Sequence, residues 1–441
     1  MKENQCTKSI PDFKPKKMRM KNYFFILLSL FIVLLSEAQS LDTYKLLKPD
    51  RIFDGEKMLT GPVVLVKNNV IEQVGAMTLK LPSGTEIIEL KGMTLLPGLI
   101  EGHSHLFLHP YNEVTWNDQV LKETRSERTI RAVNHARATL MAGFTTVRDL
   151  GTEGAMYDDV GLKESIEKGL IPGPRMIIAT RAIVASGSYG PKLSPDKTNE
   201  IGAAEANGYD ELIREIRTQI GNGADLIKMY ADYRWGLNRM AQPTFTLEEL
   251  KLAVEVTGSS GRKVVTHAAT EAGMMRSVLA GVSTIEHGDQ GTEEVFALMA
   301  EKGVALCPTL AAGESILSYG GWKKGIDPEP QRITDKKKSF ALALKSGVKI
   351  CMGGDVGVFA HGHNAKEMEL MAEYGMKPLD VLKSATSVNA DVFGYGDKLG
   401  RIRSGLMADI IAVEGDPSKD LKDIWMVKMV MKDGKLYKKP E

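Results

Sequence analysis

The sequence predicts an α/β protein: a (β/α)8 TIM barrel with a small β-sandwich domain built from both ends of the chain. Apolar, strand-like runs alternate with helical stretches through the middle of the chain, as in a parallel sheet covered by helices. Short β-rich runs separated by turn residues come before this region and return after it. We expect the β-sandwich domain at 39–97 and 399–441, and the barrel at 98–398.

Length and charge limit the class of protein. The 441 residues contain 57 Lys and Arg against 56 Asp and Glu, 43% hydrophobic residues and 3 Cys. These values are typical of a globular protein with a large domain and a smaller module, and they exclude a disordered chain or a disulfide scaffold. Because the net charge is only +1, nothing indicates a nucleic-acid partner, and we expect a small-molecule substrate. A homo-oligomer stays open.

Residues 1–38 form a separate segment. They carry seven Lys or Arg and three Asp or Glu, and the fifteen residues from Asn22 to Ser36 are uncharged. A basic flank, a short apolar run and small residues at the −3 and −1 positions, Ser36 and Ala38, are typical of a secretory signal peptide, whereas a membrane-spanning helix needs about 20 apolar residues. We therefore expect cleavage after Ala38, export to a periplasm and no stable membrane span. The alternative is a short membrane anchor.

The β-rich runs at the two ends predict one small antiparallel sheet. Before the barrel, these runs lie at 63–66, 70–74 and 87–90, and after it they lie at 409–413 and 425–437.

Eight apolar runs supply the strands of the barrel over about 300 residues, within the usual range of this fold. They lie at 98–103, 145–149, 175–180, 225–231, 263–267, 282–287, 304–310 and 349–355. Helices are expected between them at 128–141, 210–221, 247–261, 273–281, 293–303, 332–347 and 365–375.

Polar side chains of metal-ligand type fall at the ends of these runs. His103 and His105 are two residues apart at the end of a strand, so both imidazoles lie on one face and can bind one ion. The strands of a barrel open their carboxyl ends on one side, where residues distant in sequence meet. Four more polar residues end or interrupt other β-like runs: Lys228, His267, His287 and Asp355.

Lys228 lies within an apolar strand. Burial lowers the pKa of a lysine and favours the neutral amine, which can react with carbon dioxide to give a carbamate. The two carbamate oxygens can bridge two divalent cations, for which nitrogen and oxygen ligands favour Zn²⁺.

This pattern resembles the amidohydrolase superfamily, whose binuclear members have HxH on the first strand, a carboxylated lysine on the fourth, histidines on the fifth and sixth, and an aspartate on the eighth. The resemblance extends over nearly all of the chain that follows the signal segment. It includes LPGLIEGH at 96–103, AGFTTVRD at 142–149, GRI at 400–402 and GLMAD at 405–409. These segments are similar to the imidazolonepropionase-related branch, which includes dipeptidases acting on Xaa-Pro and on Xaa-Arg or Xaa-Lys.

The resemblance implies a binuclear metal-dependent hydrolase that cleaves a C–N amide bond by attack of a metal-bridging hydroxide. His103, His105 and Asp355 would hold one ion, His267 and His287 the other, with carbamylated Lys228 between them. Asp355 would act as the general acid and base. Tyr230, two residues after Lys228 on the same strand face, would bind the oxyanion, and its alternative role is barrel packing.

For the substrate, we expect a dipeptide of the Xaa-Pro kind or an N-acyl amino acid. The chain departs from its relatives at Tyr189, where they often have a histidine, and at 231–236, where they often have a Gly-Gly turn. Candidate substrate contacts are Tyr230, Tyr189, His361 and Arg234, although Arg234 and Arg181 can equally form ordinary surface ion pairs.

Two alternatives stay open. The same site can hydrolyse a cyclic amide, a lactone or another ester, or the protein can be an exported metal- or solute-binding protein without turnover. Cys307 and Cys351 have no nearby base motif, and we expect buried free thiols rather than nucleophiles or a disulfide.

Overall fold

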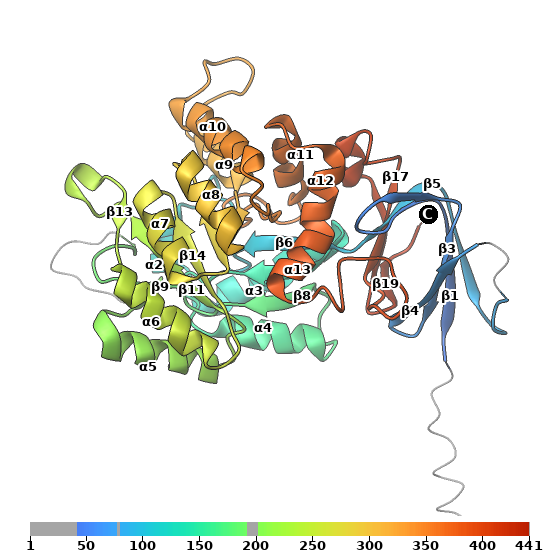
Figure 1. Cartoon of the computed structure of the whole chain (residues 1–441). Helices are drawn as coiled ribbons and strands as arrows, with labels where there is room; N and C mark the ends of the chain where they lie inside the picture. Colours follow the sequence, from blue (N-terminus) through green and yellow to red (C-terminus); the bar gives the residue numbers. More distant parts are fainter. Residues whose placement is uncertain (1–41, 77–79, 192–201, 441) are drawn as a thin grey trace, which may run out of the picture. The chain divides into compact units, whose positions relative to one another are not determined.

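Strands from the two ends of the chain share one sheet in the computed structural model, which describes residues 42–76, 80–191 and 202–440 (Figure 1). The predicted signal segment, 1–38, lies outside the described residues. The sheet runs in the order β19-β18-β17-β5-β1-β3-β4, and β2 pairs with β1. Its strands are β1 (Tyr44–Phe53), β2 (Met58–Thr60), β3 (Val63–Lys67), β4 (Val70–Gly75), β5 (Glu86–Pro97), β17 (Ile410–Glu414), β18 (Val427–Lys432) and β19 (Lys435–Lys438).

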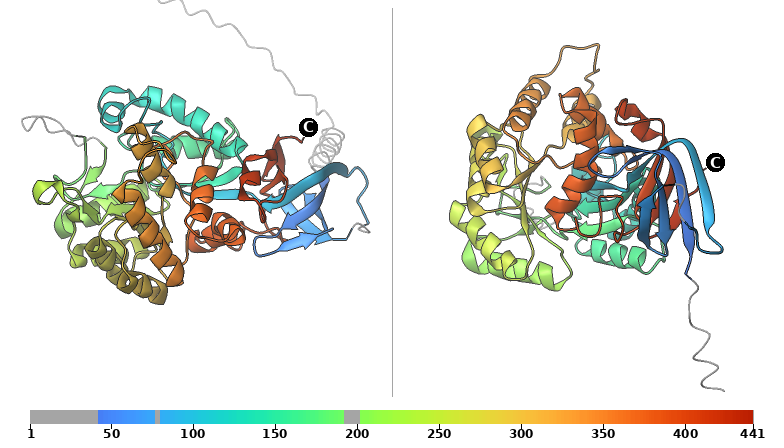
Figure 2. Two further views of the ribbon diagram at one scale, coloured as in Figure 1. Left: turned by 90° about the horizontal axis from the view of Figure 1, so that it is seen from above. Right: turned by 45° about the vertical axis from the view of Figure 1, so that its right-hand side comes forward.

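This sheet differs from the prediction in one pairing. β1 and β5 are parallel, whereas the sequence predicted an antiparallel sheet. β3 and β4 form an antiparallel hairpin on one edge of β1. The chain then crosses to the other edge of β1, where β5 runs in the same direction as β1. β17 then pairs antiparallel with β5, which brings the C-terminal strands beside the N-terminal ones (Figure 2).

The middle of the chain forms parallel strands connected by helices, as the sequence predicted. One sheet has the order β6-β7-β8 and another the order β10-β9-β11-β14-β15-β16. The strands are β6 (Leu99–Ser104), β7 (Phe144–Asp149), β8 (Arg175–Ile178), β9 (Ile183–Val184), β10 (Ala204–Glu205), β11 (Ile227–Tyr230), β14 (Val264–Ala268), β15 (Thr284–His287) and β16 (Ala305–Cys307). A short hairpin, β12 (Asp232–Tyr233) with β13 (Gln242–Pro243), follows β11.

The seven predicted helices are present with small shifts of their ends, as α3 (Arg125–Met141), α5 (Gly208–Gly221), α6 (Leu247–Gly258), α7 (Glu271–Ala280), α8 (Glu293–Lys302), α10 (Gln331–Lys345) and α11 (Ala365–Glu373). The structure adds α2 (Trp116–Lys122), α4 (Asp158–Glu167), α9 (Leu310–Tyr319), α12 (Pro378–Lys383) and α13 (Asn389–Phe393). Short helical turns lie at Leu237–Arg239, Ser384–Val388 and Leu421–Trp425.

Two predicted strand runs end differently in the structure. The run 304–310 stops at Cys307, because Thr309 has a φ of +52° that ends the strand, and α9 begins directly after it. The run 349–355 forms only isolated bridges, Leu306 with Ile350 and Ser104 with Val356. These bridges still connect β16 to β6 through residues 350–356, so the edges of the two parallel sheets meet there.

Gly353 explains the close approach of this last run to β6 and β16. A side chain at this position would lie 2.3 Å from Sγ of Cys307 and 2.8 Å from the backbone nitrogen of His103. Cys307 and Cys351 are free and buried, as expected. Among the described residues, no helix combines the length and the apolar character that crossing a membrane requires.

Candidate active site

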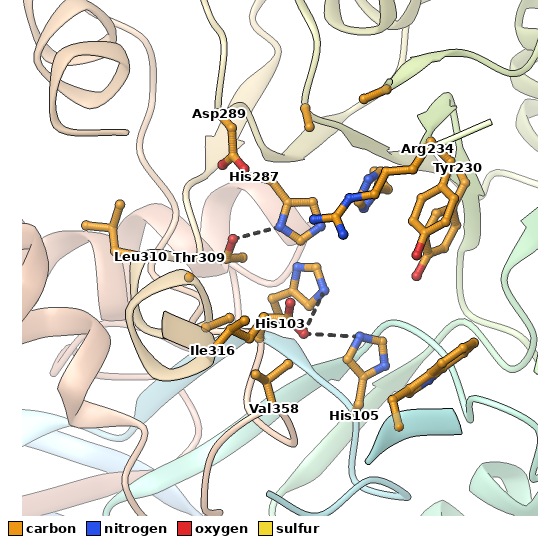
Figure 3. Close-up of a pocket in the computed structure, with 18 of the residues that line it drawn as sticks. His103, His105, Tyr230, Arg234, His287, Asp289, Thr309, Leu310, Ile316 and Val358 are labelled. Carbon is orange, nitrogen blue, oxygen red and sulfur yellow. Dashed lines mark hydrogen bonds and ion pairs between the residues drawn. The ribbon is translucent and has the colours of Figure 1, made fainter. Parts of the chain in front are cut away.

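A cavity of about 350 Å³ opens where the parallel strands end (Figure 3). Nearly every strand contributes to it, because the parallel strands all present their carboxyl ends to this side. Its lining includes aromatic, charged and ligand-type residues: His103, His105, Leu108, Tyr111, Trp116, Glu153, Tyr189, Tyr230, Tyr233, Arg234, His267, His287, Asp289, Thr309, Arg332 and Asp355.

Three of the predicted ligands form a tight group at the floor of this cavity. Oδ1 of Asp355 lies 3.6 Å from Nε2 of His103 and 3.4 Å from Nε2 of His105. One ligand atom from each of the three residues lies within 4.8 Å of the others. Both histidines turn Nε2 toward Asp355 because their Nδ1 atoms are bonded elsewhere, to Glu286 and to the carbonyl of Gly151. Two imidazoles and one carboxylate in this arrangement fit a divalent cation.

His267 and His287 form a second pair beside the first. Their ring centroids are 4.4 Å apart, and those of His103 and His287 are 5.3 Å apart. Nδ1 of His287 lies 2.7 Å from the hydroxyl of Thr309, so its Nε2 is free to face the cavity. Burial, followed by the positive charge of Lys228, lowers the pKa of His267 to about 3. A neutral imidazole is the form that binds a metal, so both rings suit a second ion.

The backbone at two of these positions is left-handed. His287 has a φ of +76° and Asp355 a φ of +61°. Side chains other than glycine rarely adopt this conformation, which costs free energy and persists where the surrounding structure enforces it. Each turn directs a ligand-type side chain from the end of its strand into the cavity.

Lys228 lies in β11, and its side chain is nearly inaccessible at 1% exposure. Its Nζ has no hydrogen-bond partner among the described residues. Burial lowers the pKa of this amine to about 8, although the negative charge of Glu286 opposes the shift. An unpartnered buried amine is costly, so this position fits a lysine that carries an additional group better than a structural lysine.

The sequence analysis missed the residues that support this floor. Arg148 donates hydrogen bonds of 2.8 Å to Glu286 and 2.9 Å to Thr284. Glu101 accepts hydrogen bonds from the backbone of His103 and of Gly354 and from the side chain of Asn364. The sequence signal for these residues was a charged side chain inside an apolar strand, because a charged residue is almost never fully buried unless it is paired. Their partners, however, lie up to 263 positions away.

Tyr230 and Tyr189, both predicted substrate contacts, line the cavity and stack on each other with ring centroids 4.4 Å apart. Tyr230 also stacks on His267 at 4.6 Å. Burial, followed by the negative charge of Glu153, raises the pKa of both tyrosines well above 10. Their hydroxyls therefore keep their protons and can donate hydrogen bonds in the cavity.

Two exposed arginines also line the cavity, Arg234 after β12 and Arg332 on α10. Neither has a hydrogen bond or ion pair with another described residue. Arg181, the other arginine that we considered, lies outside the lining and donates to the carbonyl of Ala203.

The structure does not bring His361, a predicted substrate contact, to the cavity, because His361 is not among the residues that line it. Its ring stacks on His135 with centroids 4.3 Å apart, and its Nε2 lies 3.0 Å from the carbonyl oxygen of Leu108. The turn at Gly362, with a φ of +89°, brings this segment against α3. The sequence showed only that His361 follows Asp355 closely, which does not fix the direction of its side chain.

Comparisons with known proteins agree with this geometry. The model of the amidohydrolase family matches residues 94–437, which include the six predicted ligands. An ochratoxinase of Aspergillus niger is 32% identical over 380 residues, covering 78% of this chain and 76% of that protein.

Two solved structures are similar over 90% of this chain and 100% of their own. A Xaa-Pro dipeptidase with bound methionine in the active site has a TM-score of 0.80 and 30% sequence identity. A prolidase complexed with N-methylphosphonate-L-proline has a TM-score of 0.78 and 26% identity.

Proposed function

This chain belongs to the amidohydrolase family and is a hydrolase of C–N amide bonds, and we propose that it uses two metal ions to cleave a dipeptide or an N-acyl amino acid. The observation that carries this proposal is that five ligand-type side chains line one cavity, while the buried amine of Lys228, in the adjoining strand β11, has no hydrogen-bond partner among the described residues. The bridges at Ile350 and Val356 and the two similar peptidase structures also support a closed eight-stranded barrel.

In this proposal, His103, His105 and Asp355 hold one ion, and His267 and His287 hold the other. Two imidazoles leave the second ion short of ligands, and an unmodified ammonium cannot bind a cation. A carbamate formed from Lys228 and carbon dioxide would supply further oxygen ligands and would account for a buried nitrogen without a hydrogen-bond partner. Nitrogen and oxygen ligands favour Zn²⁺, which when bound provides Lewis acidity and lowers the pKa of water.

Asp355 moves the proton. Burial raises the pKa of its carboxyl to about 6, while His105 and Lys228 oppose the shift. A carboxylate beside the attacking water can accept its proton and return it to the leaving nitrogen. The cavity also holds Tyr230, whose protonated hydroxyl is suited to stabilise the negative oxygen of the tetrahedral intermediate.

Two arginines that line the cavity are suited to orient the substrate. Arg234 and Arg332 have no partner among the described residues, and a guanidinium in this state can bind the carboxylate of a dipeptide or of an N-acyl amino acid. The similarity to a Xaa-Pro dipeptidase and to a prolidase supports an amide whose leaving group is an amino acid.

The test is hydrolysis by purified protein reconstituted with zinc. A library of dipeptides and N-acyl amino acids is offered beside a panel of lactones and cyclic amides, and release of free amino acids is measured with and without a chelator. We expect release from at least one linear amide and its loss on metal removal. Turnover of only the lactones or cyclic amides would favour the first alternative, and binding without any turnover would favour a metal- or solute-binding protein.

We also propose that residues 1–38 direct export. The support is the basic residues that come first, the uncharged run from Asn22 to Ser36, and the small residues Ser36 and Ala38 at the −3 and −1 positions. N-terminal sequencing of the protein recovered from outside the cytoplasm tests this, and a first residue of Gln39 is expected.

A further inference from the structure

One side of the cavity is an aromatic enclosure, formed by Trp116, Tyr189, Tyr230 and Tyr233. The ring of Tyr189 is in its centre, with centroid distances of 5.1 Å to Trp116, 4.4 Å to Tyr230 and 5.0 Å to Tyr233. These residues come from three separate segments of the chain, so tertiary folding assembles the enclosure. Trp116, Tyr189 and Tyr233 are half-buried, so part of each side chain is open to the cavity.

Among the carboxyl groups that line the cavity, Glu153 is hydrogen-bonded to two of these rings. Glu153 lines the same cavity, and its side chain is buried, with an exposure of 2%. Its Oε2 accepts a hydrogen bond of 2.9 Å from the indole of Trp116 and another from the hydroxyl of Tyr189. Its Oε1 has no hydrogen-bond partner among the described residues. The nearest charged-type atom to Oε1 is Nδ1 of His105 at 3.9 Å, and that nitrogen is already bonded to Gly151.

The backbone holds Glu153 in this place against its local preference. Its φ is +50°, in the left-handed region that non-glycine residues rarely adopt. The buried guanidinium of Arg128 fixes the turn by donating to the carbonyl oxygens of Glu153 and Thr152, at 2.8 and 3.0 Å. Arg128 therefore binds the backbone of this turn, and the side chain of Glu153 lines the cavity. A carboxylate used only for packing would not leave one buried oxygen unsatisfied.

We propose that Glu153 and the aromatic enclosure bind the free ammonium group of the substrate's acyl residue, so that the preferred substrates are dipeptides with an unblocked amino terminus rather than N-acyl amino acids. This inference rests on the proposed function and decides between the two substrate classes which that proposal leaves open. Aromatic faces attract a cation through their quadrupole, and a buried carboxylate binds it by charge-assisted hydrogen bonds.

The carboxylate at the other end of such a substrate has Arg332 as its candidate partner. Arg332 lies on α10, which packs on α8 and α9, whereas Glu153 follows β7. A dipeptide is a dipolar ion, with an ammonium at one end and a carboxylate at the other. Glu153 and Arg332 match these two charges on different elements of the cavity, which five of the six predicted metal ligands also line.

The test compares two substrates that differ only in the amine: a phenylalanyl amino acid and the corresponding 3-phenylpropionyl amino acid. The leaving amino acid is the one that the zinc-loaded wild-type protein releases fastest from a dipeptide library. We expect kcat/KM to be about 10- to 100-fold higher for the free amine, which is the range of one or two charge-assisted hydrogen bonds. This preference should fall above about pH 8, where an α-amino group loses its proton.

Glu153→Gln keeps the shape and an acceptor for Trp116 and Tyr189 but removes the charge. It should lower kcat/KM for the free amine by about 10- to 100-fold and change the desamino substrate by less than about threefold. Glu127→Gln is the matched control, because Glu127 is an exposed residue of α3 paired with Arg131, and both substrates should react as with wild type. If Glu153→Gln does not fold, Trp116→Leu, which opens the enclosure, should also affect the free amine more.

Equal losses on both substrates, or a wild-type protein that does not distinguish them, would overturn this inference and leave the proposed function standing. Failure of the wild-type protein to release any amino acid from any amide would overturn the proposed function, and the inference with it.

Discussion

Nδ1 of His103 donates a hydrogen bond of 2.9 Å to Oε2 of Glu286, and both side chains are buried. This bond fixes the tautomer and the ring orientation of His103, so that Nε2 points at Asp355. Glu286 is itself held by Arg148 at 2.8 Å. The direction of a predicted metal ligand thus depends on two residues that the sequence analysis did not select.

The first prediction follows from that bond. Glu286→Gln keeps the volume but no longer offers a charged acceptor to His103 and Arg148, so the ring loses its fixed orientation. Metal affinity and activity should each fall by about 10- to 100-fold, as is usual when an outer partner of a metal-binding histidine is changed. Metal titration of the chelator-treated protein measures this. Glu294→Gln in the first turn of α8 is a control, and an unchanged affinity in the Glu286 variant would contradict the assignment.

The second prediction concerns proton transfer. Asp355→Asn should lower kcat by about 10²- to 10⁴-fold, because an amide cannot accept and return a proton, and a larger loss would mean that metal is also lost. Two imidazoles and the amide oxygen remain near the first ion, so much of the bound metal should be retained. Elemental analysis beside the rate separates the two effects. Wild-type turnover in this variant would exclude Asp355 as the base.

The third prediction concerns the buried amine. Lys228→Ala removes the proposed bridge between the ions, so metal content and activity should be lost together. A short carboxylate such as formate or acetate can enter the space and restore part of both. Lys302→Ala, at an exposed position of α8, should behave as wild type. Full occupancy of two ions in the Lys228 variant, measured by elemental analysis, would contradict the bridge.

The fourth prediction concerns stability and pH. Glu367 on α11 is buried and accepts hydrogen bonds from the backbone of Leu310 and Ala311, at 3.0 and 2.7 Å. Burial raises its pKa from 4.5 to about 8, against the effect of these two donors. Between these values the folded state keeps the proton that the unfolded state releases, so this group makes the protein less stable as pH rises from about 4.5 to 8.

Glu367→Gln should remove that contribution and flatten the loss of stability across this range, where one such group changes the free energy of unfolding by at most about 1.4 kcal/mol per pH unit. Urea unfolding of chelator-treated protein between pH 5 and pH 8 measures it. Glu369→Gln, at a half-exposed position of the same helix, is the control. Parallel stability curves for wild type and the Glu367 variant would show that the carboxyl is ionised in the folded state throughout.

Much of the fold was readable from local pattern. Apolar periodicity located seven of the helices and most of the parallel strands to within a few residues, because each of these elements buries a face whose period appears in the sequence. Prediction failed where a single backbone angle decided the outcome, as at Thr309, whose φ of +52° ends a strand and allows α9 to begin. It also failed at α4, whose polar composition hides its buried residues.

The sequence by itself determined the family and the chemical types of the ligands, because histidine, lysine and aspartate at strand ends are fixed by local order along the chain. Only the tertiary structure decided which side chains face the cavity: it turned His361 away onto His135 and placed Glu153 among the aromatic rings. The physical reason is that side-chain direction depends on hydrogen bonds and packing between distant segments. Arg128 holding the turn at Glu153 is one such contact, and nothing in the neighbouring residues encodes it.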